Sequence, residues 1–193
     1  MNSPISEALL LHATATVIDA QREKLPQVSA PFRLPDPIGV ARQTTELGGL
    51  IAELGDEYLF RADASAPQEH TTHAAEAFAN TIGSVAQAAS ALGTVAQQLA
   101  FVARTAGKRG EPGYEDAHTD AGQLIELAVE TARDDLAEAA QTLRTAASAV
   151  SPPPAVKVQR AALARSPGAS TASPAPIATA VAVAAQRAPA RAR

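Results

Sequence analysis

The chain has 193 residues, enough for one domain of ordinary size plus a further segment. It has no Cys and no Trp, and only two Tyr and four Phe, which excludes disulfides and thiolate metal sites and leaves almost no aromatic platform for stacking single-stranded nucleic acid. The net charge of −4 is unevenly spread: residues 1–150 carry all 20 acidic residues and 10 basic ones, whereas residues 151–193 carry six basic residues and no acid. The composition therefore predicts an acidic body, net −10, followed by a basic tail.

Two shorter helices are predicted in the first third of the chain. Ser3, followed by Pro, has the chemistry of an N-cap and first helical position, and it predicts a helix over residues 3–24 that ends before Pro26. Asp36, also followed by Pro, repeats this signal and predicts a second helix over residues 37–63.

Residues 67–106 and 114–150 predict two long helices. In both, small and apolar residues recur at alternating steps of four and three, the heptad spacing that keeps one stripe of a helix against a partner helix. A Gly-rich connection joins them, so we predict an antiparallel hairpin. The larger residues of the two stripes, which we interpret as an interaction seam, are Phe78, Ile82, Val85, Leu92, Leu99, Ile125, Val129, Leu136 and Leu143.

Local signals predict how these helices begin, bend and end. Ser65 and Gln68 have the spacing of a capping box at the start of the first long helix. Gly107 is predicted to end that helix in a left-handed conformation. Gly48 and Gly49 predict either a kink in the second short helix or the close approach of a neighbouring helix.

Together the elements predict an all-α fold, an up-down antiparallel four-helix bundle over residues 3–151 with a long coiled-coil-like hairpin. The two shorter helices are expected to leave part of the hairpin overhanging, as a surface for a homo-dimer. Residues 152–193, rich in Pro, Ala and Ser, are predicted to be disordered. The short helices are expected to cover the second apolar face of the hairpin, at Ala75, Val95, Val102, Leu124 and Leu127.

The four histidines raise the question of a metal site. Glu115 and His118 match one Glu-x-x-His unit of carboxylate-bridged di-iron bundles, and His70, His73 and Glu76 form a second possible group of ligands. A di-iron site needs two such units and further glutamates, and these two groups would lie at opposite ends of an antiparallel hairpin, roughly 50 Å apart. We therefore expect no metal and no cofactor, and keep a ferritin-like metal-binding bundle as an alternative.

Catalytic motifs are missing from the sequence. It contains no Gly-x-Gly-x-x-Gly, Walker or Gly-x-Ser-x-Gly pattern, and a narrow bundle packed with Ala offers little concave volume for a small-molecule substrate. We therefore expect that the protein is not an enzyme.

An acidic strip follows the second long helix at four-residue steps, at Glu126, Glu130, Asp134 and Glu138. Its simplest interpretation is a solvated face that keeps an Ala-rich bundle soluble. The alternative is a docking strip for a basic partner, which includes the basic tail of the chain itself.

The function that these features favour is that of a non-catalytic helical interaction or scaffolding protein. It would self-associate through its Ala/Leu seams, bind a protein partner, and use the basic tail as a tether or partner-binding segment. The alternative that uses this tail is a nucleic-acid-associated accessory protein, although six scattered charges beside an acidic body are a poor match for phosphate binding.

The cellular compartment can be predicted only from targeting and membrane signals that the sequence does not contain. No apolar run approaches the length of about 20 residues that spans a bilayer, and the first residues have no basic region typical of a secretory signal. We expect a cytoplasmic protein and leave a leaderless secretion route open. Abundant Ala, with Arg in place of Lys, is typical of a high-GC bacterial genome.

Overall fold

The computed structural model describes residues 3–27, 33–64 and 68–151, and the predicted tail lies outside these described residues. Residues Met1–Pro153 form one compact unit. Within the described ranges the chain forms four α-helices, a single 3-10 turn and no strand, so the predicted all-α class is confirmed. The elements are α1 (Pro4–Glu23), α2 (Pro37–Ala62), α3 (Glu69–Thr105), the 3-10 turn η1 (Ala106–Lys108) and α4 (Tyr114–Val150). Every helix bound falls within two residues of the predicted one.

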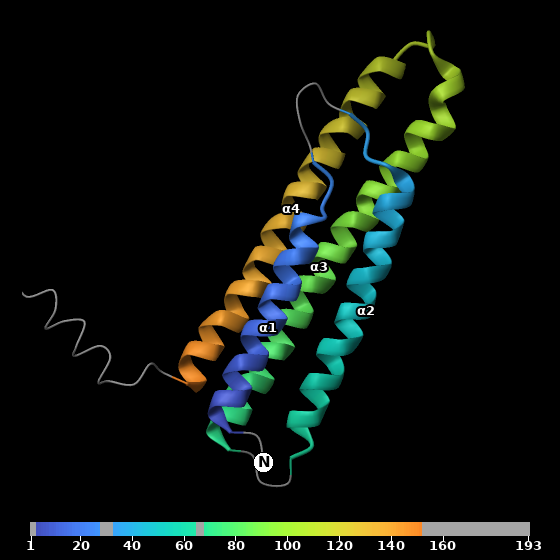
Figure 1. Ribbon diagram of the computed structural model, residues 1–193. Coiled ribbons are helices and arrows are strands. Elements are labelled where there is room, and N and C mark those ends of the chain that lie inside the picture. The colour runs from blue at the N-terminus through green and yellow to red at the C-terminus, as the bar shows by residue number, and fades with distance from the viewer. Residues whose placement is uncertain (1–2, 28–32, 65–67, 152–193) are drawn as a thin grey trace, which may run out of the picture. The chain divides into compact units, whose positions relative to one another are not determined.

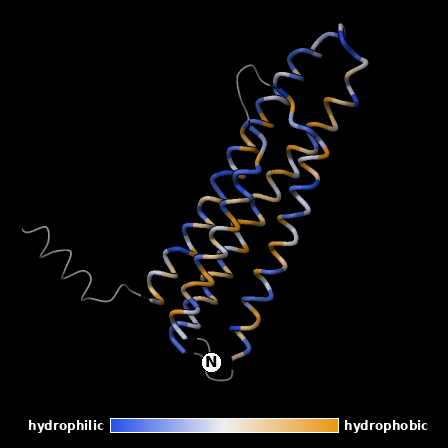
Figure 2. Tube along the Cα trace, in the orientation of Figure 1, coloured by the Kyte–Doolittle hydropathy of each residue, from blue (hydrophilic) through white to orange (hydrophobic). Residues whose placement is uncertain are grey.

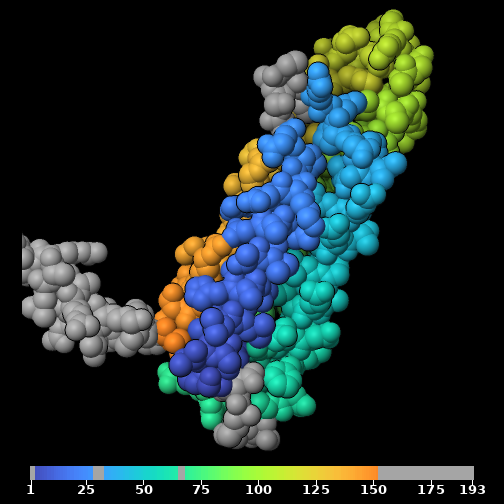
Figure 3. Space-filling model, viewed as in Figure 1, coloured from blue at the N-terminus to red at the C-terminus, as the bar shows by residue number. Residues whose placement is uncertain are grey.

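Successive helices run in opposite directions, which gives an up-down bundle (Figure 1). The hairpin of α3 and α4 forms its centre, with α2 packed along α3 and α1 packed along α4. Because α3 and α4 have 37 residues each, against 20 in α1 and 26 in α2, the η1 end of the hairpin projects past both shorter helices (Figures 1 and 3). The predicted overhang is therefore present.

The core follows the seam along the centre of the bundle (Figure 2). Eight of the nine predicted seam residues are buried, and Ile82 is partly buried. Ala96 and Ala103, which continue the same four-and-three spacing on α3, are exposed. Other buried residues of α3 lie off the predicted seam: Ala74, Ala77, Thr81, Ala88 and Val95.

The prediction that the short helices cover the second apolar face of the hairpin is wrong at two positions. Leu124 and Leu127 remain 45 % and 65 % exposed, whereas Val95 is buried. The reason is that α1 ends before it reaches them: Arg133, six residues further along α4 than Leu127, already donates to the backbone carbonyl of Pro26, which follows α1.

A buried ion pair joins the beginning of α1 to the end of α2. Nε of Arg61 donates to Glu7, and each of these two side chains is only 1 % exposed. Nη1 of Arg61 donates to the backbone carbonyl and to Oε2 of Glu57, both at 2.6 Å. The guanidinium lies 4.5 Å from the centroid of the Phe78 ring, so Arg61 connects α1 and α2 to α3.

Two polar contacts tie the other end of α1 to the middle of α2. Gln43 donates from Nε2 to the backbone carbonyl of Gln21 at 2.9 Å, and Lys24 lies 2.7 Å from Glu46. Hydrogen bonds from the side chains of Lys24 and Gln21 lower the pKa of Glu46. These contacts link α1 and α2, whose backbones approach each other less closely than those of α3 and α4, α2 and α3, or α1 and α4.

The roles predicted for Gly48, Gly49 and Gly107 are not the ones that the structure shows. No atom of a neighbouring helix lies within 4 Å of where a Cβ would stand on Gly48 or Gly49, and α2 continues through both, so neither marks a close approach or a break. Gly107 falls inside η1, and the left-handed conformations are instead those of Gly110 (φ 97°) and Gly113 (φ 79°), the N-cap of α4. Gln68 caps α3 without a side-chain hydrogen bond, and Ser65 lies outside the described residues.

Candidate interaction face

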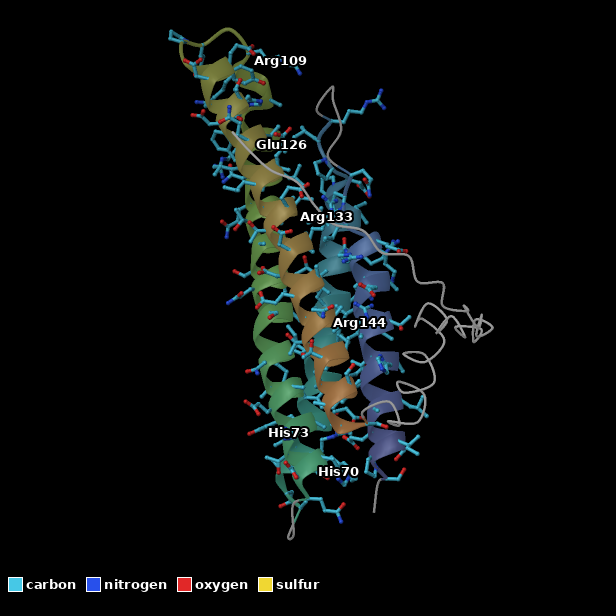
Figure 4. All side chains as sticks on the ribbon, turned by 90° about the vertical axis from the view of Figure 1, so that its left-hand side faces the viewer. His70, His73, Arg109, Glu126, Arg133 and Arg144 are labelled. Carbon is cyan, nitrogen blue, oxygen red and sulfur yellow. The ribbon has the colours of Figure 1, made fainter. Side chains whose placement is uncertain are left out.

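The hairpin has one long side that neither α1 nor α2 covers. Two shallow grooves follow each other along it between α3 and α4, and only residues of these two helices line them. Successive residues of an α-helix are about 100° apart, so Asp135 lies on nearly the opposite side of α4 from Arg133, and Thr142 from Arg144. Both arginines bond toward the α1 side of the bundle (Figure 4). We call the uncovered side, defined by the lining residues of the two grooves, the outer face.

The upper groove, nearer η1, has a volume of about 420 Å³. Most of the side chains that line it on α3 and α4 are small, which leaves a groove between the two helices. Leu124 and Leu127 lie at its border. Leu124 and Leu127 give it an exposed apolar edge. Its lining residues are Gln87, Ser90, Ala91 and Thr94 of α3, and Leu124, Leu127, Ala128, Thr131 and Asp135 of α4.

The lower groove continues the upper one toward the other end of the hairpin, with a volume of about 390 Å³. On α4 it begins at Glu138, one turn after Asp135. His73 and Glu76 contribute to it from α3 (Figure 4 labels His73). The remaining lining residues are uncharged, with Ala, Thr, Asn and Gln side chains: Ala77, Asn80, Gln141, Thr142, Thr145, Ala146 and Ala149.

The charge of the outer face is negative. Asp135, Glu138 and Glu76 line its grooves, and no Lys or Arg does. Burial raises the pKa of Asp135, and the neighbouring Glu138 and Asp134 raise it further. Its buried Oδ2 has no hydrogen-bond donor among the described residues. The face therefore holds a partly desolvated carboxylate in a negative surrounding, an arrangement that a cation or a hydrogen-bond donor would stabilise.

The predicted acidic strip does not stay on one side of α4. A four-residue step turns a helix by about 40°, so the strip winds from Glu126, near the α1 side, to Glu138 in the lower groove. Between them, Glu130 pairs with Arg133. Only the last residue of the strip belongs to the outer face, and Asp135, which the spacing argument missed, is the other carboxylate there on α4.

The possible metal ligands do not converge. Among the described residues, no group of three or more His, Cys, Asp or Glu side chains is placed to hold a metal ion. His73 lies 3.9 Å from Glu69, one turn before it, and His70 lies in the first turn of α3 (Figure 4). Glu115 is exposed on the first turn of α4, at the other end of the hairpin.

His118 instead connects α4 to α3 near the tip of the hairpin. Its Nε2 lies 2.8 Å from Oγ1 of Thr105, and that hydroxyl already donates to the carbonyl of Phe101 at 2.8 Å. The imidazole also packs against the ring of Tyr114, with centroids 4.0 Å apart. His118 is therefore a structural link between α3 and α4.

The seam itself is used inside one chain. Phe78, Val85, Leu92, Ile125, Val129, Leu136 and Leu143 have no exposed surface, and Leu99 has little. Because these residues fill the core of the bundle, they are not a surface for a second copy. On the hairpin, the large apolar side chains that remain exposed are Leu124 and Leu127, which lie off the seam.

Among the described residues, no helix is both long enough and apolar enough to cross a bilayer. No family model matches this chain, and neither a curated protein nor a solved structure matches it.

Proposed function

We propose that this protein is a helical interaction module, or scaffold, that binds a protein partner on its outer face and has no catalytic role. The observation that carries the proposal is the exposure of Leu124 and Leu127 beside the upper groove of the outer face. Exposed apolar side chains beside a furrow of small residues are typical of surfaces that receive another helix.

The architecture supports the same function. Buried residues hold α3 against α4 from Ala74 to Leu99 and from Ala121 to Val150, so the outer face is a preformed surface and a partner binds it without reordering the bundle. The proposal gives residues 152–193, which lie outside the described residues, the role of a tether or second binding segment. It replaces self-association through the seam with binding on the outer face.

Site-specific photo-crosslinking tests the proposal. The full chain, carrying a benzophenone amino acid in place of Leu127, is irradiated in extract of the cells that make the protein. The matched control carries the same amino acid in place of Leu59, which is exposed to a similar degree on α2, outside the outer face. We expect a discrete protein adduct at position 127 and none at position 59. That adduct should disappear when Thr131→Arg fills the upper groove. Equal adducts at both positions, or an adduct insensitive to Thr131→Arg, would refute the proposal.

A further inference from the structure

The charged groups of the outer face are three carboxylates, and no Lys or Arg of the described hairpin lines its grooves. From residue 69 to residue 103 the sequence has no Lys or Arg. The two arginines of α4, Arg133 and Arg144, lie on the α1 side and bond to Glu130, the carbonyl of Pro26 and Asp19. The acids of the outer face are therefore not neutralised by neighbouring cations of the hairpin.

The shape of the face matches an α-helix. At about 1.5 Å per residue, the stripe from Leu124 to Ala149 is about 38 Å long, the length of a helix of about 25 residues. Its side chains combine exposed leucines at the upper end with carboxylates one turn apart in the middle. A helix lying in this groove would meet apolar surface and negative charge on the same side.

We infer that the outer face binds a cationic amphipathic helix of a separate protein, with small apolar residues of that helix over Leu124 and Leu127 and its Lys or Arg side chains on Asp135 and Glu138. This inference rests on the proposed function and names the chemistry of the partner. Charge complementarity carries it, since a cation on this face meets three carboxylates and no lining Lys or Arg. The raised pKa of Asp135 supports it, because a neighbouring cation would relieve the cost of that charge.

A second copy of the chain is a poorer occupant. A two-fold dimer places the same surface of both molecules together, so the outer face would bring Glu76, Asp135 and Glu138 of each copy against those of the other. Like charges in such a contact oppose association.

The test uses the full chain and a synthetic helical peptide of about 25 residues, the length of the stripe. The peptide has Leu and Ala at helical spacing on one side and Lys along both borders. One comparison peptide has the same composition in scrambled order, which keeps the charge and removes the apolar stripe. Another replaces each Lys with Gln, which keeps the stripe and removes the charge. Affinities are measured by calorimetry at low and at physiological salt.

Variants of the protein locate the binding. Asp135→Asn with Glu138→Gln is expected to weaken binding of the cationic peptide about five- to tenfold, and to reduce its dependence on salt. Leu124→Ala with Leu127→Ala is expected to weaken it about tenfold or more, because both leucines lose apolar contact. The control Glu126→Gln removes one charge from the same helix outside the grooves, and is expected to change affinity less than about twofold.

The outcomes separate the inference from the proposed function. The inference of a cationic partner would be overturned if the Lys and Gln peptides bind with equal affinity. It would also be overturned if Glu126→Gln lowers the affinity as much as the groove variants do. A chain that dimerises in sedimentation, and loses the dimer through Leu124→Ala with Leu127→Ala, would assign the face to a second copy and also overturn it. In both cases a crosslink at position 127 that Thr131→Arg removes would leave the proposed function standing.

Discussion

Replacing Arg61 with Met should destabilise the bundle more than any other single side-chain change considered for this protein. Arg61 lies at the junction of α1, α2 and α3, and its guanidinium bonds to Glu7 and Glu57 and covers the Phe78 ring. Met has a similar length and no charge, so the substitution removes the cation while it keeps most of the packing. The Glu7 carboxylate, only 1 % exposed, then loses its guanidinium in a site that water does not reach.

The expected cost follows from that burial. Breaking a buried ion pair by removing one member typically costs about 3–5 kcal/mol, because the other charge remains desolvated. Glu57 adds little to this, since its side chain is 40 % exposed and water can replace the lost bond. For a domain of this size, 3–5 kcal/mol corresponds to a fall in melting temperature of about 6–20 °C.

The double variant Glu7→Leu with Arg61→Met provides the control. It removes both charges, so its stability should return to within about 1–2 kcal/mol of the wild type. Urea unfolding followed by circular dichroism at pH 7 gives the three free energies of unfolding and their coupling. The reasoning is refuted if Arg61→Met alone costs less than about 1 kcal/mol, or if the double variant is as unstable as the sum of the two single ones.

Three further predictions concern single sites. Gly48→Ala should raise the stability of the bundle by about 1 kcal/mol, since Gly48 is exposed inside α2 and nothing lies where the methyl would stand, and a lower melting temperature would contradict this. Gly113→Ala should lower stability by about 1 kcal/mol, because a side chain at φ 79° is strained, and an unchanged urea midpoint would show that the turn relaxes. Asp135→Asn should be more stable than the wild type at pH 7 and equal to it at pH 3. The raised pKa means that the folded protein holds the Asp135 proton more tightly than the unfolded chain, so ionisation above about pH 4 costs stability. Urea midpoints measured from pH 3 to pH 8 check the sign, and a difference that does not change with pH would assign the effect to something other than this charge.

Local chemistry determined the elements of this protein. Asp36, with its side chain accepting from the amides of Ile38 and Gly39, and Ser3, accepting from Ser6, begin α2 and α1 where the sequence predicts. The heptad spacing identified most of the core, because large apolar residues repeated on one side of a helix favour burial against a neighbouring helix. These signals act over three or four residues, so they can be read without knowledge of the fold.

Tertiary packing decided the candidate site. Whether Leu124 and Leu127 are covered depends on how far α1 extends along α4 and on which side of α4 it lies, and nothing within α4 itself specifies either. The acidic strip also shows what spacing alone cannot predict. Regular four-residue spacing included Glu126, which lies near the α1 side, and omitted Asp135, which lines the upper groove. The burial of Glu7 against Arg61, 54 residues away, could not be predicted from the sequence either. A charged residue is buried only where the fold brings a partner of opposite charge to it. The sequence by itself thus determined four helices and their core stripes, and only the assembled bundle decided which side of the hairpin remains open.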